Sequence, residues 1–210
     1  MDAKTLYQEG LKLVEQGKLE EAISTFTKAK EAAPMYTEIL LNLGVVLMRS
    51  QRNAEAIIVF EQARAIKAPT SFSGKDVAGD VLINLGAALT VTKKFDEAAK
   101  VLGQAKAEYP KTPAVYQNLS ALYAARGDQD NALLCIKEGI KQTRDPELYI
   151  VLANICVKMK KWRDANNMLV LAGHAGHKDQ AMIDKKIKEI RKIIPSDFTV
   201  TVAGVDITDR

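Results

Sequence analysis

The sequence is poor in the residues that cross-link a chain or interrupt its helices. Its 210 residues include two cysteines, six prolines, twelve glycines, one tryptophan and two histidines. Two cysteines are too few for a disulfide framework, so we expect a reducing, cytoplasmic location. No stretch approaches the ~18 consecutive apolar residues of a transmembrane helix. The N-terminus MDAKTLYQEGLK lacks the uncharged apolar run of a secretory signal.

An excess of charge of one sign is also missing. The formal net charge is +4, and the basic residues are spread through the chain among acidic ones. A strong basic patch is typical of proteins that bind nucleic acid, so this distribution indicates a solvated surface and no nucleic-acid partner. The hydrophobic fraction of 47% and the charged fraction of 27% are those of an ordinary globular protein.

The sequence does contain a repeated motif. LLNLGVVL begins at Leu40 and LINLGAAL begins at Leu82. Small residues recur at matching places in five stretches of the chain: Gly10, Gly44, Gly86, Ser120 and Ala153. Twelve residues after each of them stands an alanine: Ala22, Ala56, Ala98, Ala132 and Ala165. Four residues after each alanine stands a large apolar residue: Phe26, Phe60, Leu102, Ile136 and Leu169. Small residues at fixed places let two helices cross closely, so the pattern predicts stacked helical pairs.

This pattern resembles the tetratricopeptide repeat family, whose unit is a helix–turn–helix of about 34 residues. The resemblance implies an all-α fold, a right-handed superhelical solenoid of five units and a capping helix. The units are expected at residues 3–36, 37–70, 79–112, 113–145 and 146–178. The segment KDQAMIDKKIKEIRKII places its isoleucines on one helical stripe, so we interpret 179–194 as the cap that completes a solenoid domain over 1–194. Trp162 parallels Phe95 in its unit and is interpreted as a core residue.

About eight extra residues, TSFSGKDV at 70–77, separate the second unit from the third. They are not a phosphate loop, because Pro69 stands where that motif needs a glycine and no Ser or Thr follows the lysine. One interpretation is a flexible or regulated loop. The other, which the spacing favours, is a longer helix start with Ser73 as N-cap and Asp76 as its capping-box-like partner.

The tail at 195–210 alternates apolar and polar residues in SDFTVTVAG, the period of a strand. One or two short strands do not fold alone. Three interpretations stay open: a loose tail, the start of a further domain, or a strand that docks on this chain or on a neighbour.

Each copy of the repeated motif places an asparagine within an apolar helix. On a helical wheel, Asn42 lies opposite the side that carries Leu43 and Gly44, in a second face that is otherwise largely apolar. The resemblance implies that the first helix of each unit lines a concave groove. It also implies that asparagines one repeat apart hold the main chain of an extended peptide. The alternative is a local role, such as bonding between adjacent helices.

The predicted peptide-binding groove therefore comprises Asn42, Asn84, Asn118, Tyr7, Gln8, Leu11, Leu41, Val45, Arg49, Ile83, Ala87, Gln117, Ala121, Ile150 and Asn154. Chaperone-binding members of the family carry a clamp of lysines, asparagines and an arginine. Tyr7, Leu11 and Asp80 are among the residues at the matching places, so an acidic chaperone C-terminus is not the expected ligand.

No constellation in the sequence predicts catalysis or a cofactor. His174 and His177 have a spacing that could place both on one metal, with Asp179 as a loose third candidate. We interpret them as a polar helix end, where a histidine is favoured by the helix dipole. A Ser–His–Asp order, a glycine-rich phosphate loop and a paired-acid motif are all missing from the sequence. We expect no enzyme, no metal and no cofactor.

The sequence therefore predicts a non-catalytic adaptor or scaffold that binds an extended or helical protein segment in its groove. The main alternative is a structural subunit that packs through its edges or convex face. Such a subunit could also self-associate, through the open first repeat or through the C-terminal tail. A weaker alternative is a regulatory domain of a larger enzyme.

Overall fold

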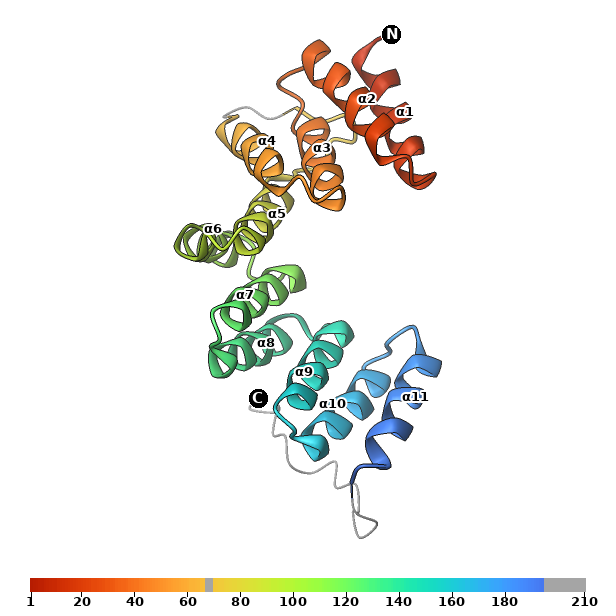
Figure 1. Ribbon diagram of the computed structural model, residues 1–210, viewed down its shortest axis with the longest axis vertical. Coiled ribbons are helices and arrows are strands. Elements are labelled where there is room, and N and C mark those ends of the chain that lie inside the picture. Colours follow the sequence, from red (N-terminus) through yellow and green to blue (C-terminus); the bar gives the residue numbers. More distant parts are fainter. Residues whose placement is uncertain (67–69, 195–210) are drawn as a thin grey trace. The chain divides into compact units, whose positions relative to one another are not determined.

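The computed structural model describes residues 1–66 and 70–194 of the chain (Figure 1). Over these residues it contains eleven α-helices and no strand, which confirms the all-α prediction. The predicted strand-like tail at 195–210 and Pro69 lie outside the described residues. The helices are α1 Ala3–Glu15, α2 Leu19–Ala32, α3 Thr37–Arg49, α4 Asn53–Ala65, α5 Ala78–Val91, α6 Phe95–Glu108, α7 Pro113–Ala125, α8 Gln129–Thr143, α9 Pro146–Lys158, α10 Trp162–His174 and α11 Gln180–Arg191.

The helices gather into two compact units, which are described separately. Unit 1, Met1–Tyr109, holds the pairs α1–α2, α3–α4 and α5–α6, and unit 2, from Pro110 onward, holds α7–α8, α9–α10 and the single helix α11. Within each unit the second helix of one pair packs on the first helix of the next, and α11 packs on α10. The helices thus form a repeat stack in each unit, in which neighbours bury one another's apolar faces.

The close crossing within each pair follows from the small residues of the repeat. A Cβ atom added at Gly10 would lie 2.6 Å from Cε1 of Phe26, and one added at Gly86 would lie 2.5 Å from Cγ of Leu102. Real Cβ atoms do not approach other heavy atoms so closely, so the glycines let these large side chains rest directly on the first helix. Phe26 and Leu102 are fully buried as a result.

The end of the repeat stack in unit 2 is covered by α11. Ile183, Ile190 and Ile194 are buried, and Ile187 packs against the same core cluster. Trp162, the first residue of α10, also packs against this cluster, as expected for a core residue.

The connection between α4 and α5 differs from the favoured prediction. Helix α5 begins at Ala78 with Val77 at the N-cap position, so the prediction of Ser73 as its N-cap is wrong. Asp76 does accept a hydrogen bond from the backbone N–H of Ala78, at 2.9 Å, but Ser73 points elsewhere. Its hydroxyl bonds to Glu38 of α3, and this contact with a distant helix outweighs the local capping pattern.

Candidate functional site

The first helix of each pair lies on the inner side of its stack. In unit 1, α3 contacts α5 directly as well as packing on α4, and in unit 2, α7 contacts α9. First helices that touch one another across the intervening second helix occupy the narrower side of the stack. We call the accessible surface of α1, α3 and α5 the inner face of unit 1, and that of α7 and α9 the inner face of unit 2.

The three predicted asparagines adopt the same local arrangement. Their Nδ2 atoms each donate a 2.8 Å hydrogen bond to the carbonyl oxygen one turn earlier, Asn42 to Glu38, Asn84 to Asp80 and Asn118 to Ala114. This bond fixes the side chain on the helix surface. A side-chain amide has two N–H donors and one acceptor oxygen, so one bond to its own helix leaves it able to form further hydrogen bonds.

Asn42 additionally joins two helices. Its Nδ2 donates to the Tyr7 hydroxyl of α1 at 3.3 Å, so part of its amide serves the local role that the sequence left open. Burial, followed by the nearby negative charge of Glu38, raises the pKa of Tyr7, while the bond from Asn42 opposes that rise. The tyrosine therefore keeps its proton at neutral pH and has an O–H group to donate.

The other predicted groove residues differ in how much of each reaches the surface. Six of them are half-buried: Tyr7, Leu11, Leu41, Val45, Ala87 and Gln117. Four are exposed: Gln8, Arg49, Ala121 and Asn154. Ile83 and Ile150 are buried, with 6% and 4% exposed, so their prediction as groove-lining residues is corrected. They belong to the cores because first helices also pack on one another, a contact that a single-helix wheel does not include.

The inner face of unit 1 already carries a segment of the same chain. We call residues Thr70–Val77 the docked segment. The backbone N–H of Thr37 donates to Thr70 O at 3.1 Å, and the N–H of Thr70 donates to Met35 O at 3.3 Å, next to a parallel bridge between Tyr36 and Thr70. The docked segment thus begins with main-chain bonds of the kind that join two strands.

An aromatic side chain anchors the docked segment. The ring centroid of Phe72 lies 4.3 Å from that of Tyr36, in a stacked arrangement, and 5.2 Å from that of Tyr7. Tyr7 in turn lies 6.1 Å from Phe26 of the core. The two longer distances are within the range of about 4.5–7 Å for favourable aromatic pairs, and the stacked pair lies just below it. Phe72 therefore joins an aromatic row that leads from the inner face into the core.

Glu38 binds the next part of the docked segment. Its carboxylate accepts the backbone N–H of Phe72 at 2.6 Å and that of Ser73 at 3.3 Å, and it also accepts the Ser73 hydroxyl. Only 5% of Glu38 is exposed, so these donors replace the water that a buried carboxylate needs. Glu38 and Phe72 are not among the predicted groove residues. Their signal was an acid on the same helical side as Asn42, together with an aromatic residue in an insertion.

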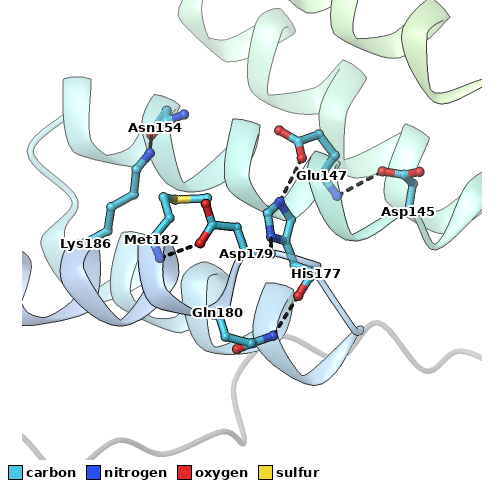
Figure 2. Close-up of polar contacts among 8 residues, drawn as sticks. All are labelled: Asp145, Glu147, Asn154, His177, Asp179, Gln180, Met182 and Lys186. Atoms are coloured by element: carbon cyan, nitrogen blue, oxygen red, sulfur yellow. Dashed lines mark hydrogen bonds and ion pairs between the residues drawn. The ribbon is translucent and has the colours of Figure 1, made fainter.

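The inner face of unit 2 is partly covered by the turn before α11 and by α11 itself (Figure 2). His177 Nδ1 accepts the backbone N–H of Asp179 at 3.1 Å, so the proton of a neutral ring lies on Nε2 and is donated to Glu147 at 2.9 Å. Lys186 donates to Oδ1 of Asn154 at 3.1 Å. Asn154, a predicted groove residue, is thus bonded to the last helix of its own unit.

Residues 7–71 match the model of the tetratricopeptide repeat family. This part of the chain is thus a tetratricopeptide repeat region. The fold of the chain is similar to that of TTC0263, a thermophilic protein of this class from Thermus thermophilus, at a TM-score of 0.68 and 18% identity, over 90% of this chain and 99% of that one. PilF of Pseudomonas aeruginosa gives a TM-score of 0.64 at 21% identity, over 91% and 87% of the two chains. At these identities the likeness concerns the fold alone.

A third solved structure of this repeat fold is described as having a peptide-binding site. YrrB, called a protein with an unusual peptide-binding site, gives a TM-score of 0.54 at 19% identity, over 90% of this chain and 92% of that one. No curated protein matches this chain in sequence. None of the helices in residues 1–66 and 70–194 has the length and apolar character needed to cross a membrane.

Proposed function

We propose that this tetratricopeptide repeat protein is a cytoplasmic, non-catalytic adaptor, in which the inner face of a unit binds an extended segment of a partner protein. Proteins of this family are protein-interaction scaffolds in general, and YrrB of the same fold has a peptide-binding site. The observation that supports the proposal most strongly lies within this chain. The docked segment is a stretch of non-helical chain, and the inner face of unit 1 holds it by main-chain hydrogen bonds and an aromatic anchor.

The asparagines supply a second supporting argument. Asn84 and Asn118 are each oriented by a bond to their own helix, and their amides have the capacity for one further donor bond and for acceptor bonds. Such groups match the C=O and N–H groups of an extended main chain, whatever its side chains are. Beside them, Ala87 and Gln117 offer half-buried surface for the partner's side chains.

A second candidate function is that of a structural subunit. Two large apolar side chains on second helices, Ile58 of α4 and Leu134 of α8, are 59% and 58% exposed. Exposed apolar residues on that side favour a partner, or another copy of the chain, that covers the second helices. This alternative predicts that substitutions on the inner faces leave binding unchanged.

Affinity capture from native lysate distinguishes the two functions. The wild type is compared with the Asn42→Ala/Asn84→Ala/Asn118→Ala variant, after circular dichroism shows that both are folded. Alanine has the higher helix propensity, so the variant is expected to keep its helices. A matched control removes amides from second helices instead, as Gln62→Ala/Gln142→Ala. We expect a protein that the wild type and the control capture and that the asparagine variant loses. Equal capture by all three would favour the structural subunit.

A further inference from the structure

We propose that the docked segment, Thr70–Val77, is an intramolecular ligand that closes the inner face of unit 1. A partner segment with an aromatic residue followed by a hydroxyl residue displaces it and takes its place. This inference rests on the proposed function of the inner face, and it adds both the kind of segment that binds there and a means of regulation.

The first argument is the way in which the docked segment is held. Four of its contacts involve main-chain atoms: the two bonds that join Thr70 to Met35 and to Thr37 at the start of α3, and the two from the N–H groups of Phe72 and Ser73 to Glu38. Main-chain bonds do not depend on the identity of the side chains. The same groups of α3 would therefore hold an extended segment of another protein equally well.

The second argument defines the partner's side chains. The space between Tyr7 and Tyr36 takes a flat aromatic ring, as Phe72 shows. Directly after that residue, the buried carboxylate of Glu38 needs hydrogen-bond donors, which Ser73 supplies with both its N–H and its hydroxyl. An acidic residue at either place would bring a second negative charge next to Glu38. The fitting partner segment is thus an aromatic residue followed by Ser or Thr, without acidic residues at these two places.

The third argument is that the docked segment up to Lys75 can leave without breaking the repeat stack, while Asp76 and Val77, which cap the start of α5, stay in place. Helices α4 and α5 pack on each other directly, so the stack of unit 1 does not depend on the segment that joins them. The fit of the segment is also incomplete. The Ser71 hydroxyl is buried with no hydrogen-bond partner among the described residues, and a cavity of about 260 Å³ lies beside it, lined in part by Thr37 and Lys75.

A tethered ligand of this kind needs little intrinsic affinity. A short connection between a ligand and its binding site gives an effective concentration on the order of 1 mM. If the segment binds with an intrinsic Kd of about 0.1 mM, it covers the inner face about nine-tenths of the time. A partner segment then binds about tenfold more weakly to the wild type than to a chain whose docked segment has lost its anchors.

The test uses the full chain and a synthetic peptide with the segment's own sequence, TSFSGKDV, as the probe. The open variant is Phe72→Ala/Ser73→Ala, and the matched control is Lys75→Ala, an exposed side chain of the same segment. We expect the peptide to bind the open variant with a Kd of about 0.1 mM, and about tenfold more weakly to the wild type and the control. NMR shifts should appear at Tyr7, Tyr36 and Glu38. A peptide with alanine in place of phenylalanine should not bind.

Absence of binding to a folded open variant at about 5 mM peptide, above the effective concentration, would overturn the proposal. Hydrogen exchange on the wild type gives a second test that needs no variant. The amides of Phe72 and Ser73 should exchange faster than those of α3, and faster still with excess peptide. Exchange as slow as that of the α3 core would show a permanent structural element and overturn the proposal. So would a wild-type dimer that the open variant converts to monomers, because the segment would then be exchanged between two copies.

The two proposals fail in different ways. If a captured partner binds the wild type and the open variant equally well but is lost by the asparagine variant, the adaptor function stands and the intramolecular ligand is refuted. If the TSFSGKDV peptide binds as expected but the asparagine variant captures the same proteins as the wild type, the docked segment is a genuine ligand of the face. In that case the asparagine-based adaptor function is refuted.

Discussion

The crossing of α3 and α4 provides a quantitative test of the packing that shapes unit 1. A Cβ atom added at Gly44 would lie 2.6 Å from Cζ and 2.8 Å from Cδ1 of Phe60, a side chain that is fully buried. A buried aromatic ring has little freedom to move away, because the surrounding core is close-packed. Gly44→Ala therefore forces either the ring or the two helices to shift.

Two opposing effects determine the size of the change. Alanine stabilises a helix interior by about 0.5–1 kcal/mol relative to glycine. Overpacking a well-packed core costs about 1–3 kcal/mol. We expect Gly44→Ala to lower the free energy of unfolding by about 0.5–2 kcal/mol, since the second effect is the larger one. Gly103 of α6 is the matched control, because an added Cβ meets nothing within 4 Å there. Gly103→Ala should stabilise the protein by about 0.5–1 kcal/mol.

Urea denaturation followed by circular dichroism measures both changes, and both glycines lie in unit 1. The equivalent pair in unit 2, Ala153 and Leu169, shows that the crossing accepts alanine when it faces leucine, as both side chains are buried there. Gly44→Ala/Phe60→Leu should therefore be more stable than the sum of its two single substitutions implies. If Gly44→Ala stabilises the protein as much as Gly103→Ala does, the explanation of the close crossing is refuted.

Three further predictions concern single positions. Lys93 is held in the left-handed region at φ 61°, which costs a residue with a Cβ about 1–2 kcal/mol, so Lys93→Gly should raise the urea midpoint; an unchanged or lower midpoint would contradict this. The hydrogen bonds from the Asn131 side chain and backbone lower the pKa of Asp128, the N-cap residue of α8. Its contribution to stability is thus present above the ordinary carboxyl pKa and is lost as the pH falls through the lowered value. Asp128→Asn should remove this part of the acid dependence of unfolding, and an unchanged acid profile would refute the role of the cap. Glu38→Gln should speed hydrogen exchange at Phe72 and Ser73 while the amides of α5 keep their protection; equal acceleration in both places would instead indicate general destabilisation of unit 1.

The parts of the fold that repeat could be predicted from the sequence. A small residue, such as the glycine at position 10, and a large apolar residue, such as the phenylalanine at position 26, recur as a pair at a fixed offset, and each such pair marks a crossing between two consecutive helices. This contact is local, so its spacing is visible in the chain. The positions of the asparagines on first helices were visible for the same reason.

The docked segment could not be predicted in this way. Phe72 contacts Tyr7 and Tyr36, and Ser73 bonds to Glu38, across long stretches of chain and only once in the molecule. A contact that occurs only once produces no periodic pattern in the sequence. The local pattern around Ser73 resembled a helix cap, but a buried carboxylate nearby offered its hydroxyl and N–H a stronger partner. Bonding between adjacent helices was an open alternative for the asparagines, but a wheel describes one helix at a time and could not name Tyr7 as the partner of Asn42.

Site-specific photo-crosslinking tests the central claim most directly. The photoreactive residue p-benzoylphenylalanine replaces Arg49 at the end of α3, a predicted groove position, or Ile58 on the exposed surface of α4. Both side chains are exposed, so the two chains are comparable in accessibility. The account predicts that a partner recovered by affinity capture is crosslinked from position 49 and not from position 58. Crosslinking from position 58 alone would place the partner on the second helices and contradict binding at the inner face.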